Sequence, residues 1–214
     1  NRRYDSGFNI TKKIIESGEL GKLVEVHFRF DRYRNEIGPK KFKEEPMAAS
    51  GLQYDLGPHL LDQAICIWGK PLNFYKVLSK NRVDTQVDDY FFIHLSYPNN
   101  LNVFLTASIV ADIQPAFIIN GTQGSFLKNH ADVQEGQLLN KIKPTDKNYG
   151  IEKPEDAGKL TLVTANNGRE TKFVQAEKGD YSKIFEAVYQ TIINDIPYPI
   201  TEEDIITQLE ILES

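Results

Sequence analysis

Hydrophobic and polar positions recur with two different periods along this chain, and the period predicts which kind of element each stretch forms. Apolar residues spaced three or four apart predict helices, whereas alternation with period two predicts strands. The helical period occurs at residues 5–18, 55–68, 181–194 and 202–212. The strand period occurs at residues 23–30, 74–79, 89–97, 101–110, 114–120, 125–129, 160–164 and 171–174.

The order of these elements predicts the fold class. Helices at both ends and strands grouped in the middle indicate an α+β fold, with a large, mostly antiparallel open sheet and helices packed on one face. We expect residues 1–214 to form a single domain. Alternation is imperfect at residues 91–97 and 103–107, where apolar side chains fall on both sides of the sheet. A two-sided apolar sheet implies a partner layer, so we expect a homo-oligomer or a domain contact through the sheet face.

Residues 31–50 lack periodicity and collect charged residues, glycine and proline. Loops of this length in compact domains are usually functional or mobile. This loop delivers Arg34 and other cations just before the helix at 55–68, so it either closes over a ligand or is a plain solvated loop.

Composition narrows the function classes. The chain has 214 residues and a net charge of -5, which gives no basic footprint for nucleic acid. The single cysteine, Cys66, excludes an intramolecular disulfide and lies in an apolar run, which predicts a buried, inert thiol. No apolar run reaches the roughly 18 residues of a membrane span and no signal peptide is visible, so we expect a soluble, cytoplasmic protein.

The helix at 55–68 carries one polar stripe on an otherwise apolar surface. Asp55 and His59 are four residues apart and therefore face the same way, with Asp62, Gln63 and Cys66 continuing the stripe. Asp55 suits the N-cap, Pro58 then falls in the first turn, and Gly69 suits the end of the helix.

Three interpretations of the Asp55 and His59 pair remain open. Asp55 could be an N-cap that satisfies a core histidine. The two residues could share a metal ion, although Asp62 or His27 would have to supply a further ligand without any recognisable spacing. Alternatively, His59 could be an acid–base catalyst: the helix N-terminus disfavours its imidazolium form and the Asp55 carboxylate favours it.

Several segments together resemble a known family. They are residues 51–63 around Asp55 and His59, residues 1–8, residues 14–23, the Gly-Thr-Gln-Gly-Ser turn at 121–125, and the Tyr-Pro pair at 198–199. They resemble the C-terminal domain of the glucose–fructose oxidoreductase / inositol dehydrogenase / rhizopine catabolism (Gfo/Idh/MocA) family.

The resemblance implies a two-domain, NAD(P)-dependent oxidoreductase that acts on a sugar, a cyclitol or a related polyol. An N-terminal Rossmann domain would hold NAD or NADP, and the C-terminal domain would supply the oligomer interface and part of the substrate site. By this analogy His59 exchanges the hydroxyl proton of the substrate, and Asp55 orients or charges His59. Substrate-binding candidates that follow from the same analogy are Arg3, Tyr4, Arg34 and Tyr54.

The sequence departs from the family pattern at the cofactor site. It contains no glycine-rich nucleotide-binding βα unit, and the Glu-Lys-Pro at 152–154 lies in a predicted loop, so we interpret that match as a coincidence. The chain starts at Asn1 without methionine. We therefore expect the C-terminal domain alone, which neither binds NAD(P) with useful affinity, nor holds a metal, nor turns over. The alternative is a non-enzymatic module that uses its sheet for dimerisation or carbohydrate binding.

Overall fold

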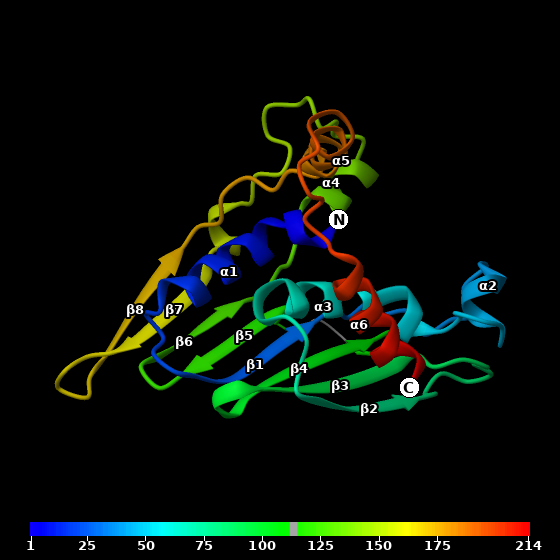
Figure 1. Cartoon of the computed structure of the whole chain (residues 1–214), viewed down its shortest axis with the longest axis horizontal. Coiled ribbons are helices and arrows are strands. Elements are labelled where there is room, and N and C mark those ends of the chain that lie inside the picture. The colour runs from blue at the N-terminus through cyan, green and yellow to red at the C-terminus, as the bar shows by residue number, and fades with distance from the viewer. Residues whose placement is uncertain (112–114) are drawn as a thin grey trace. The chain divides into compact units, whose positions relative to one another are not determined.

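The computed structural model describes residues 1–111 and 115–214. The chain forms two compact units (Figure 1). The first unit comprises Asn1–Leu23 and Phe117–Glu202, and the second comprises Val24–Ala116 and Glu203–Ser214. Gln114, where the predicted strand 114–120 begins, lies outside the described residues.

The second unit is built on strands in the order β2-β3-β4-β1. β2 pairs with β3, and β3 with β4, in antiparallel fashion, whereas β1 pairs with β4 in parallel. Its elements are β1 (Leu23–Arg29), α2 (Lys41–Glu44), α3 (Leu52–Trp68), β2 (Asn73–Ser79), β3 (Tyr90–Tyr97), a 3-10 turn (Pro98–Asn100), β4 (Leu101–Ser108) and α6 (Glu202–Glu213).

Helix α3 covers one face of these strands and packs against β3 and β4 (Figure 1). In β3 every second residue is buried, and Phe28 of β1, Ile93 of β3 and Leu105 of β4 are fully buried. The interposed residues, such as Phe92 and Phe104, are only half-buried. The buried face forms the core of the unit because its alternating apolar side chains meet the apolar side of α3.

The first unit contains strands in the order β5-β6-β7-β8, and each neighbouring pair is antiparallel. Its elements are a 3-10 turn (Arg2–Tyr4), α1 (Ser6–Ser17), β5 (Phe117–Gly121), β6 (Gly124–Lys128), α4 (Gln134–Leu139), a 3-10 turn (Pro154–Asp156), β7 (Gly158–Val163), β8 (Arg169–Val174) and α5 (Ser182–Asn194). Helix α1 packs against β5 and β6, with the Phe8 and Phe117 ring centroids 6.4 Å apart.

The predicted α+β class is confirmed: the strands are mostly antiparallel and helices pack on the sheet. Two short helices were not predicted. α2 lies inside the expected loop 31–50, and α4 lies in a polar stretch without helical periodicity. Among the described residues, no helix has the length and apolar content needed to cross a lipid bilayer.

Candidate functional site on helix α3

Helix α3 begins at Leu52, so the prediction that Asp55 caps the helix is wrong. Gly51 is the N-cap, and the cap hydrogen bonds come from Asp88, a residue distant in sequence. The Asp88 backbone oxygen accepts from Leu52 N at 2.9 Å, and its Oδ2 accepts from Gln53 N at 2.7 Å. A first-turn amide needs only a nearby acceptor, and here a tertiary contact supplies it.

The position of Pro58 was also mispredicted. Because α3 starts at Leu52, Pro58 lies in the helix interior, beyond the first turn that tolerates proline without cost. The predicted end is confirmed, since Gly69 follows the last helical residue and its N–H donates to the Ile65 carbonyl at 2.8 Å.

The predicted polar stripe lies along one side of α3 and is partly accessible. Asp55, His59, Asp62 and Cys66 are half-buried, whereas Gln63 is buried. The apolar side of the helix is buried against the sheet, with Leu60, Leu61 and Ala64 nearly inaccessible. Position 57 must stay small, because a Cβ there would lie 3.0 Å from a methyl carbon of Leu212 in α6. This packing fixes the direction in which the stripe faces.

Asp55 forms an ion pair with Lys43 of α2. Lys43 Nζ donates a hydrogen bond to Oδ1 of Asp55. The His59 ring packs near Phe30, with ring centroids 6.4 Å apart and an interplanar angle of 54°. The guanidinium carbon of Arg32 lies 5.1 Å from the centroid of the same Phe30 ring. The structure thus adds Lys43 as a partner of Asp55 and Phe30 as a neighbour of His59, and the three interpretations of the pair stay predictions.

Arg34 is held beside Asp55 through a buried carboxylate. Its Nη2 donates to Oε1 of Glu44 at 2.8 Å, and the same oxygen accepts from Gly38 N at 2.9 Å. Arg82 binds the other oxygen of Glu44 at 2.7 Å. Burial opposes ionisation of Glu44, but the hydrogen bonds from Arg82 and Gly38 hold its pKa below the usual value. Glu44 thus fixes Arg34, whose side chain remains 47% exposed.

Arg34, Lys43 and Asp55 line one small cavity together with Asp88. Tyr54 is half-buried on the same helix as Asp55. Arg3 and Tyr4 belong to the first unit, where Arg3 Nη1 donates to the Pro199 carbonyl at 2.9 Å. The structure therefore brings Asp55 and Arg34 together, while Arg3 and Tyr4 have their described bonds within the other unit.

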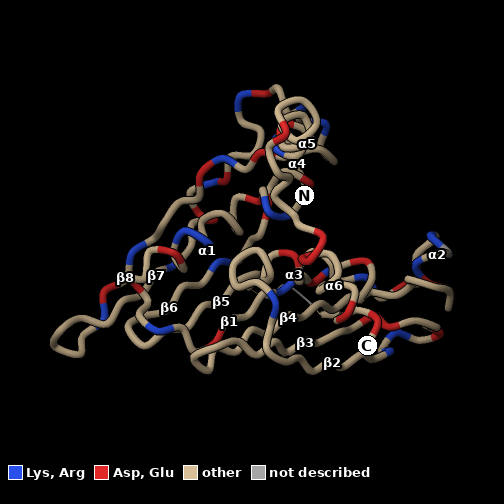
Figure 2. Tube along the Cα trace, viewed as in Figure 1, with Lys and Arg blue, Asp and Glu red and all other residues tan. Residues whose placement is uncertain are grey.

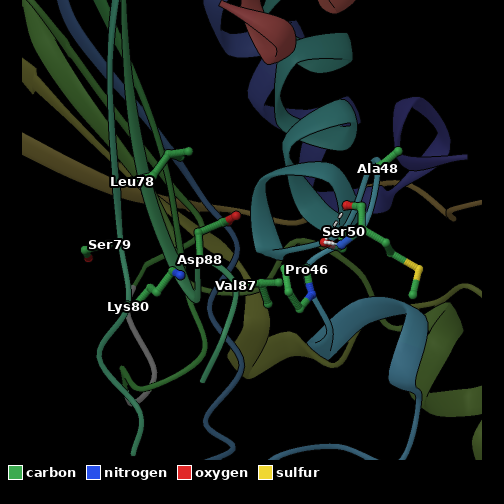
Figure 3. Close-up of a pocket in the computed structure, with 9 residues that line it drawn as sticks. Pro46, Ala48, Ser50, Leu78, Ser79, Lys80, Val87 and Asp88 are labelled. Carbon is green, nitrogen blue, oxygen red and sulfur yellow. Dashed lines mark hydrogen bonds between the residues drawn. The ribbon is translucent and has the colours of Figure 1, made fainter. Parts of the chain in front are cut away.

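A larger cavity of about 560 Å³ opens on the other side of the α3 N-terminus (Figure 3). Figure 3 shows Pro46, Ala48 and Ser50 of the connecting loop facing Leu78 and Asp88 across it. Asp88 lines both cavities. Its burial raises its pKa, and hydrogen bonds from the amides of Gln53 and Leu52 partly offset the rise.

Sequence reasoning missed three residues of this site, namely Lys43, Asp88 and Phe30. Lys43 belongs to a Lys-rich patch, and Asp88 belongs to an Asp-Asp pair that precedes a strand. Neither pattern has a spacing that would connect it to α3. For the metal interpretation, His27 lies on β1, where its Nε2 is 2.5 Å from Oε1 of Glu25. Among residues 1–111 and 115–214, no group of three or more His, Cys, Asp or Glu side chains is arranged to hold a metal ion.

The strands and helices described above make this chain an alpha/beta domain with an open, mostly antiparallel sheet. The family model for the oxidoreductase C-terminal alpha/beta domain of the Gfo/Idh/MocA type matches residues 12–214. The chain belongs to this family, which confirms the resemblance seen in the sequence.

Relatives extend the match to the whole chain. An uncharacterized oxidoreductase of Schizosaccharomyces pombe is 36% identical over 232 residues, covering 100% of this chain and 62% of the relative. The scyllo-inositol 2-dehydrogenase (NADP(+)) of Bacillus subtilis is 30% identical, covering 100% of this chain and 59% of the relative. A solved oxidoreductase structure from Bacillus cereus superposes with a TM-score of 0.90 at 34% identity, covering 100% of this chain and 62% of that one. This chain thus spans about three fifths of the length of these relatives.

Proposed function

We propose that this chain is the C-terminal domain of an NAD(P)-dependent oxidoreductase that acts on a sugar, a cyclitol or a related polyol. Membership of the oxidoreductase family supports the reaction class, and the dehydrogenase relative from Bacillus subtilis supports the polyol substrate. The remaining two fifths of the relatives' length supports a second, N-terminal Rossmann domain that holds NAD or NADP. The observation that carries the proposal is the half-buried His59 on the polar stripe of α3.

The residues of this chain do not fit a nucleotide site. A dinucleotide fingerprint needs a glycine-rich turn between a strand and a helix. The Gly-x-x-Gly at 121–124 instead closes the β5–β6 hairpin, in which Gly121 pairs with Gly124. We therefore assign the cofactor, and the acceptance of hydride, to the N-terminal domain. We expect that titration calorimetry of this chain alone with NAD or NADP gives no micromolar affinity.

The contribution of this chain is to move a proton and to orient the substrate. Histidine suits proton exchange near neutral pH, because its unperturbed pKa is roughly 6.5. His59 takes the proton of the substrate hydroxyl as the carbon is oxidised. Asp55 lies one turn away on the same face and supplies a carboxylate whose charge is offset by Lys43. Arg34 binds substrate oxygens from the cavity that it shares with Asp55, and Tyr54, Arg3 and Tyr4 are further substrate-binding candidates.

The test is His59→Asn in the full-length parent. We expect kcat to fall by about 10²–10⁴-fold, the usual contribution of a general base, with little change in melting temperature. His130→Asn is the matched control, because His130 lies in the first unit, is half-exposed and has an ion-pair contact with Asp156 at 3.5 Å. Retained activity in the His59 variant together with lost stability would assign His59 a structural role instead.

The open sheet face supports a homo-oligomer. In the second unit, the Phe92 and Phe104 rings stack with centroids 5.7 Å apart, and Tyr75 on the edge strand is 62% exposed. An aromatic face without a covering helix also favours the alternative function, a sheet-based dimerisation or carbohydrate-binding module. Sedimentation velocity at micromolar concentration tests the oligomer, and a monomer would count against it. If the His59→Asn parent is inactive but sediments like the wild type, His59 acts in catalysis and is not needed for oligomer formation.

A further inference from the structure

Helix α5 presents an apolar face that residues 1–111 and 115–214 leave exposed. Phe185, Tyr189 and Ile192 lie at spacings of four and three, so they share one side of the helix. Their exposed fractions are 74%, 54% and 70%, and no residue of α5 is buried. Val188 flanks this side and Ile196 extends it beyond the helix end. The α5 apolar face is defined here by these five residues.

The opposite side of α5 is polar, which makes the helix amphipathic. Lys183, Gln190 and Asn194 lie there, and Lys183 and Glu186 are the two charged residues of the helix. Figure 2 shows Lys and Arg in blue and Asp and Glu in red along the chain trace, including the segments around α5. An amphipathic helix normally turns its apolar stripe toward a core. Among the described residues this stripe is exposed instead, which makes it available to a partner.

The start of α5 is held in place by a buried network rather than by its own apolar side chains. The hydroxyl of Tyr181, the residue that precedes the helix, lies 3.0 Å from Oδ1 of Asp5 and 2.9 Å from Oδ2 of Asp132, and it can donate its single proton to either oxygen. Arg2 Nη1 donates to the same hydroxyl at 3.1 Å. The Tyr181 amide donates to Gln134, the first residue of α4, at 2.9 Å. The polar contacts thus set the direction of the helix and leave its apolar face free to bind.

The same network connects α5 to the segment at residues 1–5. Arg2 and Asp5 contact Tyr181 before the helix, and Arg3 donates to the Pro199 carbonyl beyond the helix end. Any residues that precede Asn1 in a longer polypeptide therefore enter beside α5. About two fifths of the relatives' length lies outside the part that this chain matches, which is enough for a separate domain.

From these observations, we propose that the α5 apolar face is the docking surface for the domain that precedes this chain in the same polypeptide, which the proposed function identifies as the nucleotide-binding domain. The inference rests on the proposed function for the existence of that domain. The docked domain covers the stripe of Phe185, Tyr189 and Ile192, and the bonds around Tyr181 hold that stripe in position. A second copy of this chain is the competing occupant.

Photo-cross-linking in the full-length parent distinguishes the occupants. Benzoyl-phenylalanine at position 192 should cross-link to a peptide from the residues preceding Asn1, in a product of monomer mass. The same group at position 183, on the polar side of α5, is the matched control and should give at least about tenfold less of that product. A cross-link found only at dimer mass, or only to peptides within residues 1–214, or no enrichment over position 183, would overturn the proposal.

Hydrogen exchange provides a second measurement. In the parent, Ile192→Gln should increase amide exchange over residues 182–194 at least about tenfold, because loss of docking exposes the helix. Lys183→Gln, which replaces an exposed cation on the opposite side, should not. Equal exchange in both variants and the wild type would contradict docking through this face. Neither cross-linking nor hydrogen exchange depends on turnover. A parent that is inactive or independent of NAD(P) would therefore overturn the proposed function, whereas the docking surface would still be tested by the cross-links.

Discussion

Replacing Gly51 with alanine should destabilise the beginning of helix α3. Gly51 is the N-cap of α3 and has φ 93° and ψ 171°, a region that residues with a Cβ rarely occupy. A Cβ at this position would also lie 2.1 Å from Oδ1 of Asp88. Asp88 cannot turn away without cost, because its Oδ2 accepts the hydrogen bond from Gln53 N. The substitution therefore adds backbone strain and breaks the cap.

The magnitude follows from these two effects. Backbone strain in a region reserved for glycine costs about 1–3 kcal/mol, and loss of a helix cap costs about 1–2 kcal/mol. The expected loss in unfolding free energy is their sum, about 2–5 kcal/mol. For a chain of 214 residues this corresponds to a fall in Tm of about 4–20 °C.

Urea unfolding followed by circular dichroism should be measured for Gly51→Ala, Asp88→Gly and the double variant. Because Asp88→Gly removes the clashing carboxylate, the double variant should lose about 1–2 kcal/mol less than the sum of the single losses. Gly136→Ala in α4 is the matched control, since a Cβ there meets nothing within 4 Å. The reasoning fails if Gly51→Ala loses less than about 0.5 kcal/mol, or if the two substitutions are additive.

Three further predictions concern buried or paired charges. Arg82→Met leaves the Glu44 carboxylate buried without its main cation, so thermal unfolding should show a loss of about 3–5 kcal/mol, and wild-type stability would contradict this. Burial raises the pKa of Asp5 from 3.8 to about 8, and the nearby Arg2 opposes the rise. Protonated Asp5 therefore contributes fully to the free energy of unfolding below pH 3.8, and this contribution is lost as the pH rises through about 8. Urea unfolding at pH 4, 6 and 8 should therefore show a falling stability that Asp5→Asn flattens, and equal slopes would refute the assignment. Lys43→Met in the full-length parent removes the cation that is paired with Asp55, so kcat/KM at a fixed pH should fall because the carboxylate loses the partner that positions it, and an unchanged kcat/KM would show that this ion pair plays no part in catalysis.

The bodies of the helices could be predicted from sequence because their periodicity is local. The spacing predicted helices over 5–18 and 181–194, and the structure has them at Ser6–Ser17 and Ser182–Asn194. Gly18 ends α1 in the left-handed conformation, with φ 72°, as its sequence position predicted. Each of these features depends only on residues within a few positions of one another.

The short helices could not be predicted, since they carry no repeated pattern. α2 spans four residues, Lys41–Glu44, and is fixed by what Glu44 contacts rather than by propensity. Glu44 accepts from Arg34 and Arg82, and Arg82 lies on the far side of α3 in sequence. A helix this short depends on tertiary contacts for its stability. Periodicity therefore identified residues 31–50 only as a stretch without regular structure.

In the site on α3, local spacing predicted some features of single residues, and tertiary contacts determine the others. The i, i+4 spacing placed Asp55 and His59 on one side of the helix, and the structure has both half-buried there. Which group each would contact depended on segments brought in by the fold. Asp88 arrives from the approach to β3 to cap the helix, Lys43 from α2 to pair with Asp55, and Phe30 from the end of β1 to pack near His59. Lys43 pairs with the Asp55 carboxylate, and Arg34 and Asp88 line the same cavity. Local spacing therefore predicted the side of the helix on which Asp55 and His59 lie, whereas the partners of each group depend on contacts that only the fold supplies.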